Sequence, residues 1–218
     1  MESTSTLSFL LSLLLLAGST SLAASSPVRT SSTNFIKASC GTTLYPALCV
    51  QSLSVYANSI QQSPRQLAQA ALSVSLARAR SASAFVSKLS RSNGMQPRDL
   101  AAMKDCVENM GDSVDRISQS IRELGRVGRS GSGSFQWHVS NVQTWVSAAL
   151  TDENTCVDGL AGPAKDGNLK AAVKGRVVHV AQVTSNALAL VNRFADSDRR
   201  SGTRFVDSDR QFGTVRNP

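Results

Sequence analysis

Apolar residues recur every three or four positions in four long stretches of the chain, and this spacing predicts four amphipathic helices. Pro64 and Pro97 open the first two stretches, and proline is favoured in the first turn of a helix. Glycine or a Gly-Pro pair follows the ends of the first and third stretches, where helices commonly stop. The four expected helices cover residues 64–92, 97–124, 136–160 and 169–194.

Short connections between consecutive helices favour antiparallel neighbours, so the simplest arrangement is an up-down-up-down four-helix bundle. Two shorter helical segments are expected upstream, at 33–40 and 45–59, with Gly41 at the turn between them. The predicted fold is therefore all-α: an antiparallel four-helix bundle preceded by an N-terminal helical hairpin.

The chain begins with an apolar run from Leu7 to Leu16, followed by small residues. This run is too short to span a bilayer and is typical of a secretory signal peptide. We expect residues 1–23 to be cleaved and 24–32 to form a flexible N-terminus. No later stretch is long and apolar enough to span a membrane, so no membrane association is expected after cleavage.

Beyond Phe194 the apolar pattern stops, and the sequence of 193–203 is repeated by 204–214 with eight of eleven positions identical. A charged segment of this kind buries too little apolar surface to offset the entropy of ordering it. We expect residues 195–218 to form a disordered tail, which leaves 33–194 as the folded domain.

The formal net charge of +8 is unevenly distributed. Between Ala24 and Arg98 there are eight Lys or Arg residues and no Asp or Glu, whereas nine carboxylates and five cations lie between Asp99 and Asp158. The basic part of the chain and its tail suit an acidic polymer such as pectin. Nucleic acid is not an expected partner of an exported protein.

The sequence lacks the motifs of common catalytic sites. Its two histidines, His138 and His179, are far apart, and no metalloprotease, nucleophile-elbow or phosphate-loop motif is present. We predict no catalytic residues, no metal site, no cofactor and no enzymatic activity. Trp137 and Trp145 are expected in the core or against a disulfide.

One face of the second long helix is acidic. If Val107 and Met110 occupy the a and d positions of a heptad, the carboxylates nearby fall on the solvent side of the bundle. Such a face is either merely solvated or a rigid surface that docks on a protein partner. The carboxylates of this acidic stripe are Asp105, Glu108, Asp112 and Asp115.

Four cysteines, Cys40, Cys49, Cys106 and Cys156, are an even set with spacings unsuited to zinc, and in an exported chain they indicate disulfides. Three pairings are possible, and the spacing alone leaves them open. Cys106 falls at a flanking g position of its helix, where a neighbouring helix passes, and Cys156 is the natural candidate there.

Together these features resemble the plant pectin methylesterase inhibitors and the related invertase inhibitors. The resemblance covers about residues 33–194. It rests on the cysteine plan, on Cys106-Val107-Glu108, on TWVSAALTDENTCVDG at 144–159 and on VTSNALAL at 183–190. It implies a four-helix bundle preceded by a helical hairpin. It also implies two disulfides, which join Cys40 to Cys49 and Cys106 to Cys156.

The resemblance also implies a function: a one-to-one complex in which the second and third bundle helices cover the pectin-binding cleft of pectin methylesterase. Inhibition of acid invertase is the alternative, although the Pro-Lys-Phe element expected of that branch is missing between the third and fourth helices. A third reading is the pro-region of a larger esterase. Carried over by offset from the cysteines, the partner-binding residues are Glu108, Asp112, Asp115, Thr155 and Asp158.

Overall fold

The computed structural model describes residues 27–92, 94–128, 133–161 and 167–212, with side chains placed within 30–198. Every regular element in these ranges is a helix. The elements in order are α2 (Pro27–Cys40), α3 (Pro46–Leu53), the 3₁₀ helix η2 (Ser54–Tyr56), α4 (Ala57–Ile60), α5 (Pro64–Leu89), α6 (Pro97–Arg126), α7 (Gly133–Gly159) and α8 (Gly167–Phe212).

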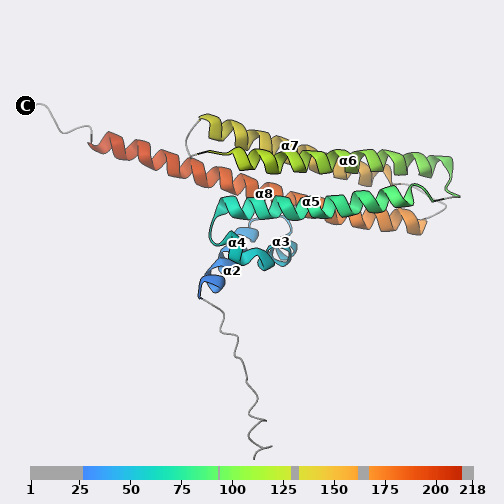
Figure 1. Ribbon diagram of the computed structural model, residues 1–218, viewed down its shortest axis with the longest axis horizontal. Coiled ribbons are helices and arrows are strands. Elements are labelled where there is room, and N and C mark those ends of the chain that lie inside the picture. Colours follow the sequence, from blue (N-terminus) through green and yellow to red (C-terminus); the bar gives the residue numbers. More distant parts are fainter. Residues whose placement is uncertain (1–26, 93, 129–132, 162–166, 213–218) are drawn as a thin grey trace, which may run out of the picture.

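The four long helices lie side by side with alternating directions (Figure 1). Each packs against two others: α5 and α7 both contact α6 and α8. Ser63 caps α5 by accepting a hydrogen bond from the Gln66 backbone N–H at 3.3 Å. Gly94, with φ +90°, adopts a left-handed conformation in the connection that follows α5. The predicted all-α class is confirmed. Helices α5 and α6 begin at the expected prolines, but α5 ends at Leu89, before the expected 92, and α6 ends at Arg126, after the expected 124.

The buried face of α6 is rotated slightly from the one that the apolar pattern predicts. The apolar residues that recur along this helix are Leu100, Met103, Val107, Met110, Val114, Ile117, Ile121 and Leu124. Half of them are fully buried, but Val107 and Val114 are only half-buried. Their places in the interior are taken by Cys106, Ser113 and Ser120, each at most 1% exposed. The buried row therefore runs through Asp99, Met103, Cys106, Met110, Ser113, Ile117, Ser120 and Leu124.

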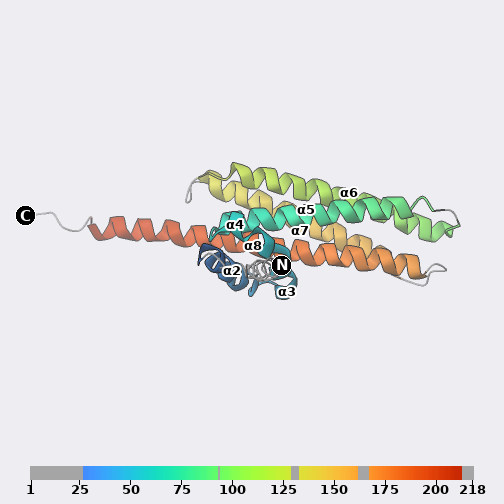
Figure 2. The ribbon, with the colours of Figure 1, turned by 60° about the horizontal axis from the view of Figure 1, so that its bottom comes forward.

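The helical hairpin formed by α2 to α4 packs on one side of the bundle, against α5 and α8 (Figure 2). A disulfide joins Cys40 to Cys49 across its turn, with the Cα atoms 5.6 Å apart. The Asn186 side chain of α8 holds the same turn, since it accepts from the Tyr45 N–H at 3.1 Å and donates to the Tyr45 carbonyl at 2.9 Å. Part of the VTSNALAL segment thus anchors the hairpin.

Two expected boundaries differ from the structure. Helix α2 begins at Pro27, within the part expected to be flexible, and α8 continues past Phe194 to Phe212 (Figure 1). Ala195 is 1% exposed and Asp198 is 7% exposed, so packing continues beyond the predicted domain end. Neither copy of the duplicated segment contains proline, and a helix already formed is extended at little cost. Residues 1–23 and 213–218 lie outside the described part of the chain.

Candidate docking surface on helices α6 and α7

The acidic stripe of α6 lies on the surface. All four of its carboxylates are exposed, because they occupy the side of α6 opposite the buried row. Glu108, Asp112 and Asp115, carried over from the family resemblance, belong to this stripe. Their exposure is as expected, and their role in binding a partner stays a prediction.

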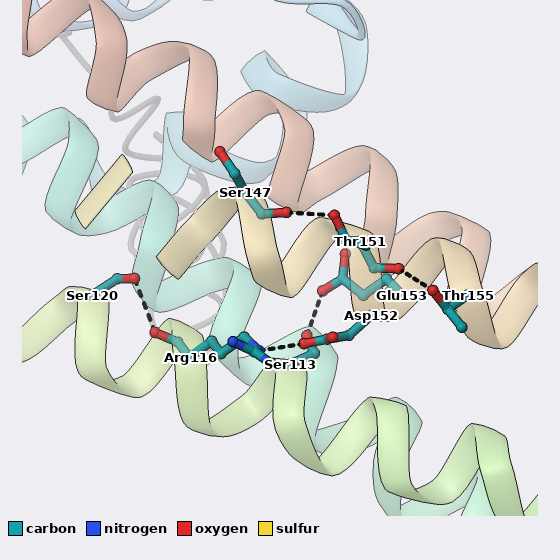
Figure 3. A network of polar contacts seen from close by, with 8 residues as sticks. All are labelled: Ser113, Arg116, Ser120, Ser147, Thr151, Asp152, Glu153 and Thr155. Atoms are coloured by element: carbon teal, nitrogen blue, oxygen red, sulfur yellow. Dashed lines mark hydrogen bonds and ion pairs between the residues drawn. The ribbon is translucent and has the colours of Figure 1, made fainter. Parts of the chain in front are cut away.

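The two other predicted contact residues, Thr155 and Asp158, are exposed on α7. Figure 3 shows Thr155 in a row of hydroxyl groups along this helix. Its Oγ1 donates to the Thr151 carbonyl at 2.8 Å, and Thr151 Oγ1 donates to the Ser147 carbonyl at 3.1 Å. Because each proton is used within the helix, each hydroxyl oxygen is left facing outward as an acceptor.

A disulfide fixes the two helices at this surface. Cys106 and Cys156 are bonded, with Cα atoms 4.4 Å apart, and both are 1% exposed. The pairing that the resemblance implied is therefore confirmed, as is that of Cys40 with Cys49. Thr155 and Asp105 each neighbour one of the bonded cysteines in sequence, so the bridge places the acidic stripe beside the hydroxyl row.

An ion pair crosses the same interface. Arg116 Nε of α6 lies 2.7 Å from Asp152 Oδ2 of α7 (Figure 3). Partial burial raises the pKa of Asp152, the Arg116 guanidinium opposes that rise, and the negative charge of Asp112 adds to it. The charges of Asp112 and Asp152 thus interact across the α6–α7 interface, and the Arg116 cation bound to Asp152 opposes the effect of Asp112.

Directly beneath this surface lies a polar cluster that the sequence reasoning missed. Glu153 is fully buried, and its Oε1 accepts hydrogen bonds from Ser113 Oγ at 2.7 Å and Thr184 Oγ1 at 2.9 Å. Thr184 also bonds Ser75 at 2.7 Å, so the cluster joins all four bundle helices. Burial raises the pKa of Glu153 to about 7.

A second buried carboxylate, Glu123, lies farther along α6. It is 2% exposed and is held by His138 Nδ1 at 2.8 Å, by Asn141 Nδ2 at 2.9 Å and by Arg126 at 3.2 Å. The hydrogen bond from Asn141, followed by those from His138 and Arg126, lowers the pKa of Glu123 against the effect of burial. His138 therefore has a structural partner.

Three other features expected from the sequence concern a tryptophan, metal sites and membrane spans. Trp137 was expected in the core or against a disulfide, but it is 61% exposed and forms a T-shaped contact with the neighbouring His138 ring. In the described ranges, no three His, Cys, Asp or Glu side chains gather as a metal site would require. No described helix is long and apolar enough to cross a membrane.

The comparisons with known proteins agree with the geometry. A family model described as plant invertase/pectin methylesterase inhibitor matches residues 34–190. The chain belongs to this family. Pectinesterase inhibitor 9 of Arabidopsis thaliana is 54% identical over 78% of this chain and 85% of its own length. Pectinesterase inhibitor 11 of the same plant is 47% identical over 86% of this chain and 93% of its own.

The fold agrees as well. A crystal structure of a mutant form of an Arabidopsis pectin methylesterase inhibitor matches with a TM-score of 0.55 at 22% identity, covering 70% of this chain and 92% of that one. Both Arabidopsis relatives are named as inhibitors, which agrees with the prediction that this family member is not an enzyme.

Proposed function

We propose that this chain is a secreted inhibitor of plant pectin methylesterase, and that the exposed face of α6 and α7 is the surface that docks on the enzyme. The observation that carries the proposal is the acidic stripe. Its exposed carboxylates lie beside Thr155 and Asp158, and the buried Cys106–Cys156 disulfide fixes the two rows relative to each other. The names of the relatives support the choice of target.

In the complex, one inhibitor covers the pectin-binding cleft of one esterase. A cleft that receives partly de-esterified pectin accommodates a chain of carboxylates, and Glu108, Asp112 and Asp115 present carboxylates on a rigid helix. Complementary charge of this kind speeds association and orients the partners more than it adds affinity. The preformed helix face also loses little conformational entropy on binding.

Secretion is supported by two features. The apolar run near the N-terminus is typical of an export signal, and the described cysteines are all in disulfides, which persist in oxidising compartments. The proposed location is the plant cell wall. Acid invertase is less well supported as a target, since the Arabidopsis relatives are named for pectinesterase.

A titration tests the proposal. The purified, oxidised mature protein is added to a plant pectin methylesterase and, in parallel, to an acid invertase at pH 5.5 and 7. We expect stoichiometric loss of esterase activity with invertase unaffected. Loss of invertase activity alone would reject the choice of target. We further infer that carboxylates of the stripe share protons with carboxylates of the cleft, so that the apparent dissociation constant varies with pH; a flat profile would reject this inference.

Two variants locate the surface. Glu108→Lys reverses one charge of the stripe and is expected to weaken esterase binding by about tenfold or more. The matched control is Gln66→Lys with Ser73→Lys, which changes the net charge equally at two exposed positions of α5. Equal weakening by both would mean that net charge, and not the stripe, governs binding.

A further inference from the structure

Charge is divided between the two layers of the bundle. Along α5 and along α8 from Gly167 to Ala195 there are eight Lys or Arg residues and no Asp or Glu. Along α6 and α7 there are nine carboxylates and five cations, none of the cations on α7. Since α5 contacts α8 and α6 contacts α7, one side of the molecule is cationic and the other acidic. The acidic side carries the proposed esterase contact, which leaves the cationic side without a function.

A groove of about 350 Å³ opens on this cationic side, between the hairpin and α5. Its walls include Gln51 and Ser52 of α3, Tyr56 of η2, and Arg78 and Ser81 of α5. Tyr56 is 44% exposed although it is aromatic, and Arg78 is also exposed. In the described part of the chain, Arg78 has no ion-pair partner. The groove thus combines an aromatic surface, a free guanidinium, an amide and hydroxyl groups.

The cationic surface continues along α5 from the groove. Phe85 lies two helical turns beyond Arg78, about 10 Å along the axis, on nearly the same face of α5. The guanidinium of Arg176, from α8, stacks over the Phe85 ring at 4.3 Å from its centre. A stacked guanidinium keeps its N–H donors free at its edge, where they can bind a carboxylate. Two arginines are therefore spaced along one face, each near an aromatic ring.

We propose that this groove, together with the Phe85–Arg176 pair, is a binding site for an acidic polysaccharide of the polyuronate class. A polyuronate carries a carboxylate on each sugar, and each sugar ring also has an apolar C–H face and hydroxyl groups. Arginine binds carboxylates through two parallel hydrogen bonds, tyrosine packs against the apolar ring face, and Gln51 with the serines bonds hydroxyls. The choice of polyuronate rests on the proposed function, because pectin is the polymer on which the inhibited enzyme acts.

The esterase and the polyuronate bind to opposite sides of the molecule and can be bound at the same time. The groove faces away from α6 and α7, since the hairpin packs on the α5–α8 side of the bundle (Figure 2). A molecule held on de-esterified pectin through α5 and α8 still presents its acidic stripe. The inhibitor is thereby concentrated on the polymer where its target enzyme has produced free carboxylates.

The test measures binding of three oligosaccharides of equal length to the oxidised mature protein by calorimetry. They are an unesterified oligogalacturonate, the same oligomer fully methyl-esterified, and a neutral cello-oligosaccharide. We expect only the first to bind. Arg78→Ala and Tyr56→Ala should each weaken that binding about tenfold. The matched control, Arg80→Ala, removes the same charge from an exposed position of α5 outside the groove and should change binding less than about twofold.

Three results would overturn the proposal: equal weakening by Arg80→Ala and Arg78→Ala, binding of the methyl-esterified oligomer with the same affinity, or displacement of the oligomer by the esterase. Complex formation with the esterase is measured separately, by gel filtration without polymer, and Arg78→Ala should leave it unchanged. A protein that binds oligogalacturonate but no esterase would contradict the proposed function, whereas one that binds esterase but no oligogalacturonate would contradict only the groove.

Discussion

Glu153 and Glu123 are both buried between α6 and α7, yet their surroundings shift their pKa values in opposite directions. Among the described residues, Glu153 meets only hydroxyl donors, from Ser113 and Thr184, and its Oε2 has no hydrogen-bond partner. Burial therefore dominates and raises its pKa to about 7. Glu123 is bonded by Asn141, His138 and Arg126, and these partners lower its pKa. The number and charge of the donors, and not burial alone, decide whether a buried carboxyl group is ionised.

The two sites should therefore respond to pH with opposite signs. When the pKa of a carboxyl group is higher in the folded state than in the unfolded state, unfolding releases its proton, and stability falls as pH rises between the two values. For Glu153 this interval extends from its ordinary value of 4.5 to about 7. The lowered pKa of Glu123 instead contributes stability above its ordinary value of 4.5, which is lost as pH falls below it. The protein is expected to be most stable at mildly acidic pH.

The largest effect is expected from removing the disulfide at the Glu153 end of this interface. Cys106–Cys156 links residues separated by 50 positions, so the Cys106→Ala, Cys156→Ala double variant should lower the free energy of unfolding by about 4 kcal/mol in the chain-entropy account. Cys40–Cys49, with a separation of nine, serves as the control and should contribute about 2.5 kcal/mol. Urea denaturation at pH 5.5 measures both.

The same variant distinguishes the two glutamates. Cys156 lies one turn from Glu153, whereas Glu123 is about 25 Å along α6 from Cys106. Without the disulfide, water reaches Glu153 more easily, and the fall in stability between pH 5 and 7.5 should shrink. The loss of stability below pH 4.5, which protonation of Glu123 causes, should remain. An unchanged slope above pH 5 would show that the disulfide does not help to keep Glu153 dry.

The next largest effect concerns Glu153 itself. Across pH 5 to 7.5 the free energy of unfolding of the wild-type protein should fall by about 2 to 3 kcal/mol, the equivalent of its pKa shift. Glu153→Gln keeps the size of the side chain and an acceptor for Ser113 and Thr184 but cannot ionise. The variant should match the wild type near pH 5 and be more stable at pH 7.5. A variant that loses stability with the wild-type slope would assign the pH dependence to another group.

The outline of the fold could be predicted from the sequence because prolines and glycines mark the helix boundaries in the expected way. Pro64 and Pro97 begin α5 and α6 where the pattern places them. The phase of α6 could not be predicted from apolar residues alone, since Ser113 and Ser120 are polar yet buried. These small serines lie in the buried row of α6, which packs against α7. An interpretation based on apolar residues alone places them beside the buried face instead of on it.

The buried glutamate left a signal that such a search also overlooks. Val142, Val146, Ala149, Glu153 and Cys156 follow one another at alternating steps of four and three, so Glu153 continues the buried row of α7. Its neighbours Asp152 and Asn154 are also polar, so a search for apolar residues finds no signal at this position. Thr184 is polar as well, and it continues the buried row of α8 between Val180 and Ala187. Conversely, the exposure of the acidic stripe could be predicted from its spacing. Whether the buried face of α6 runs through Val107 or through Cys106, the four carboxylates lie on the solvent side of the helix.

The smallest of these effects is expected at Glu123, where the paired variant Glu123→Gln completes the comparison. The amide removes the negative charge that bonds Asn141, His138 and Arg126, and it should lower stability by about 1 to 2 kcal/mol at pH 7. The loss should fade as pH falls from 4.5 through the lowered pKa of folded Glu123, where the wild-type carboxyl is protonated as well. Glu123→Gln should thus converge with the wild type in acid, whereas Glu153→Gln diverges from it as pH rises. If Glu123→Gln instead gained stability at pH 7, Glu123 would be a carboxyl group that burial holds protonated, and the contrast between the two sites would be wrong.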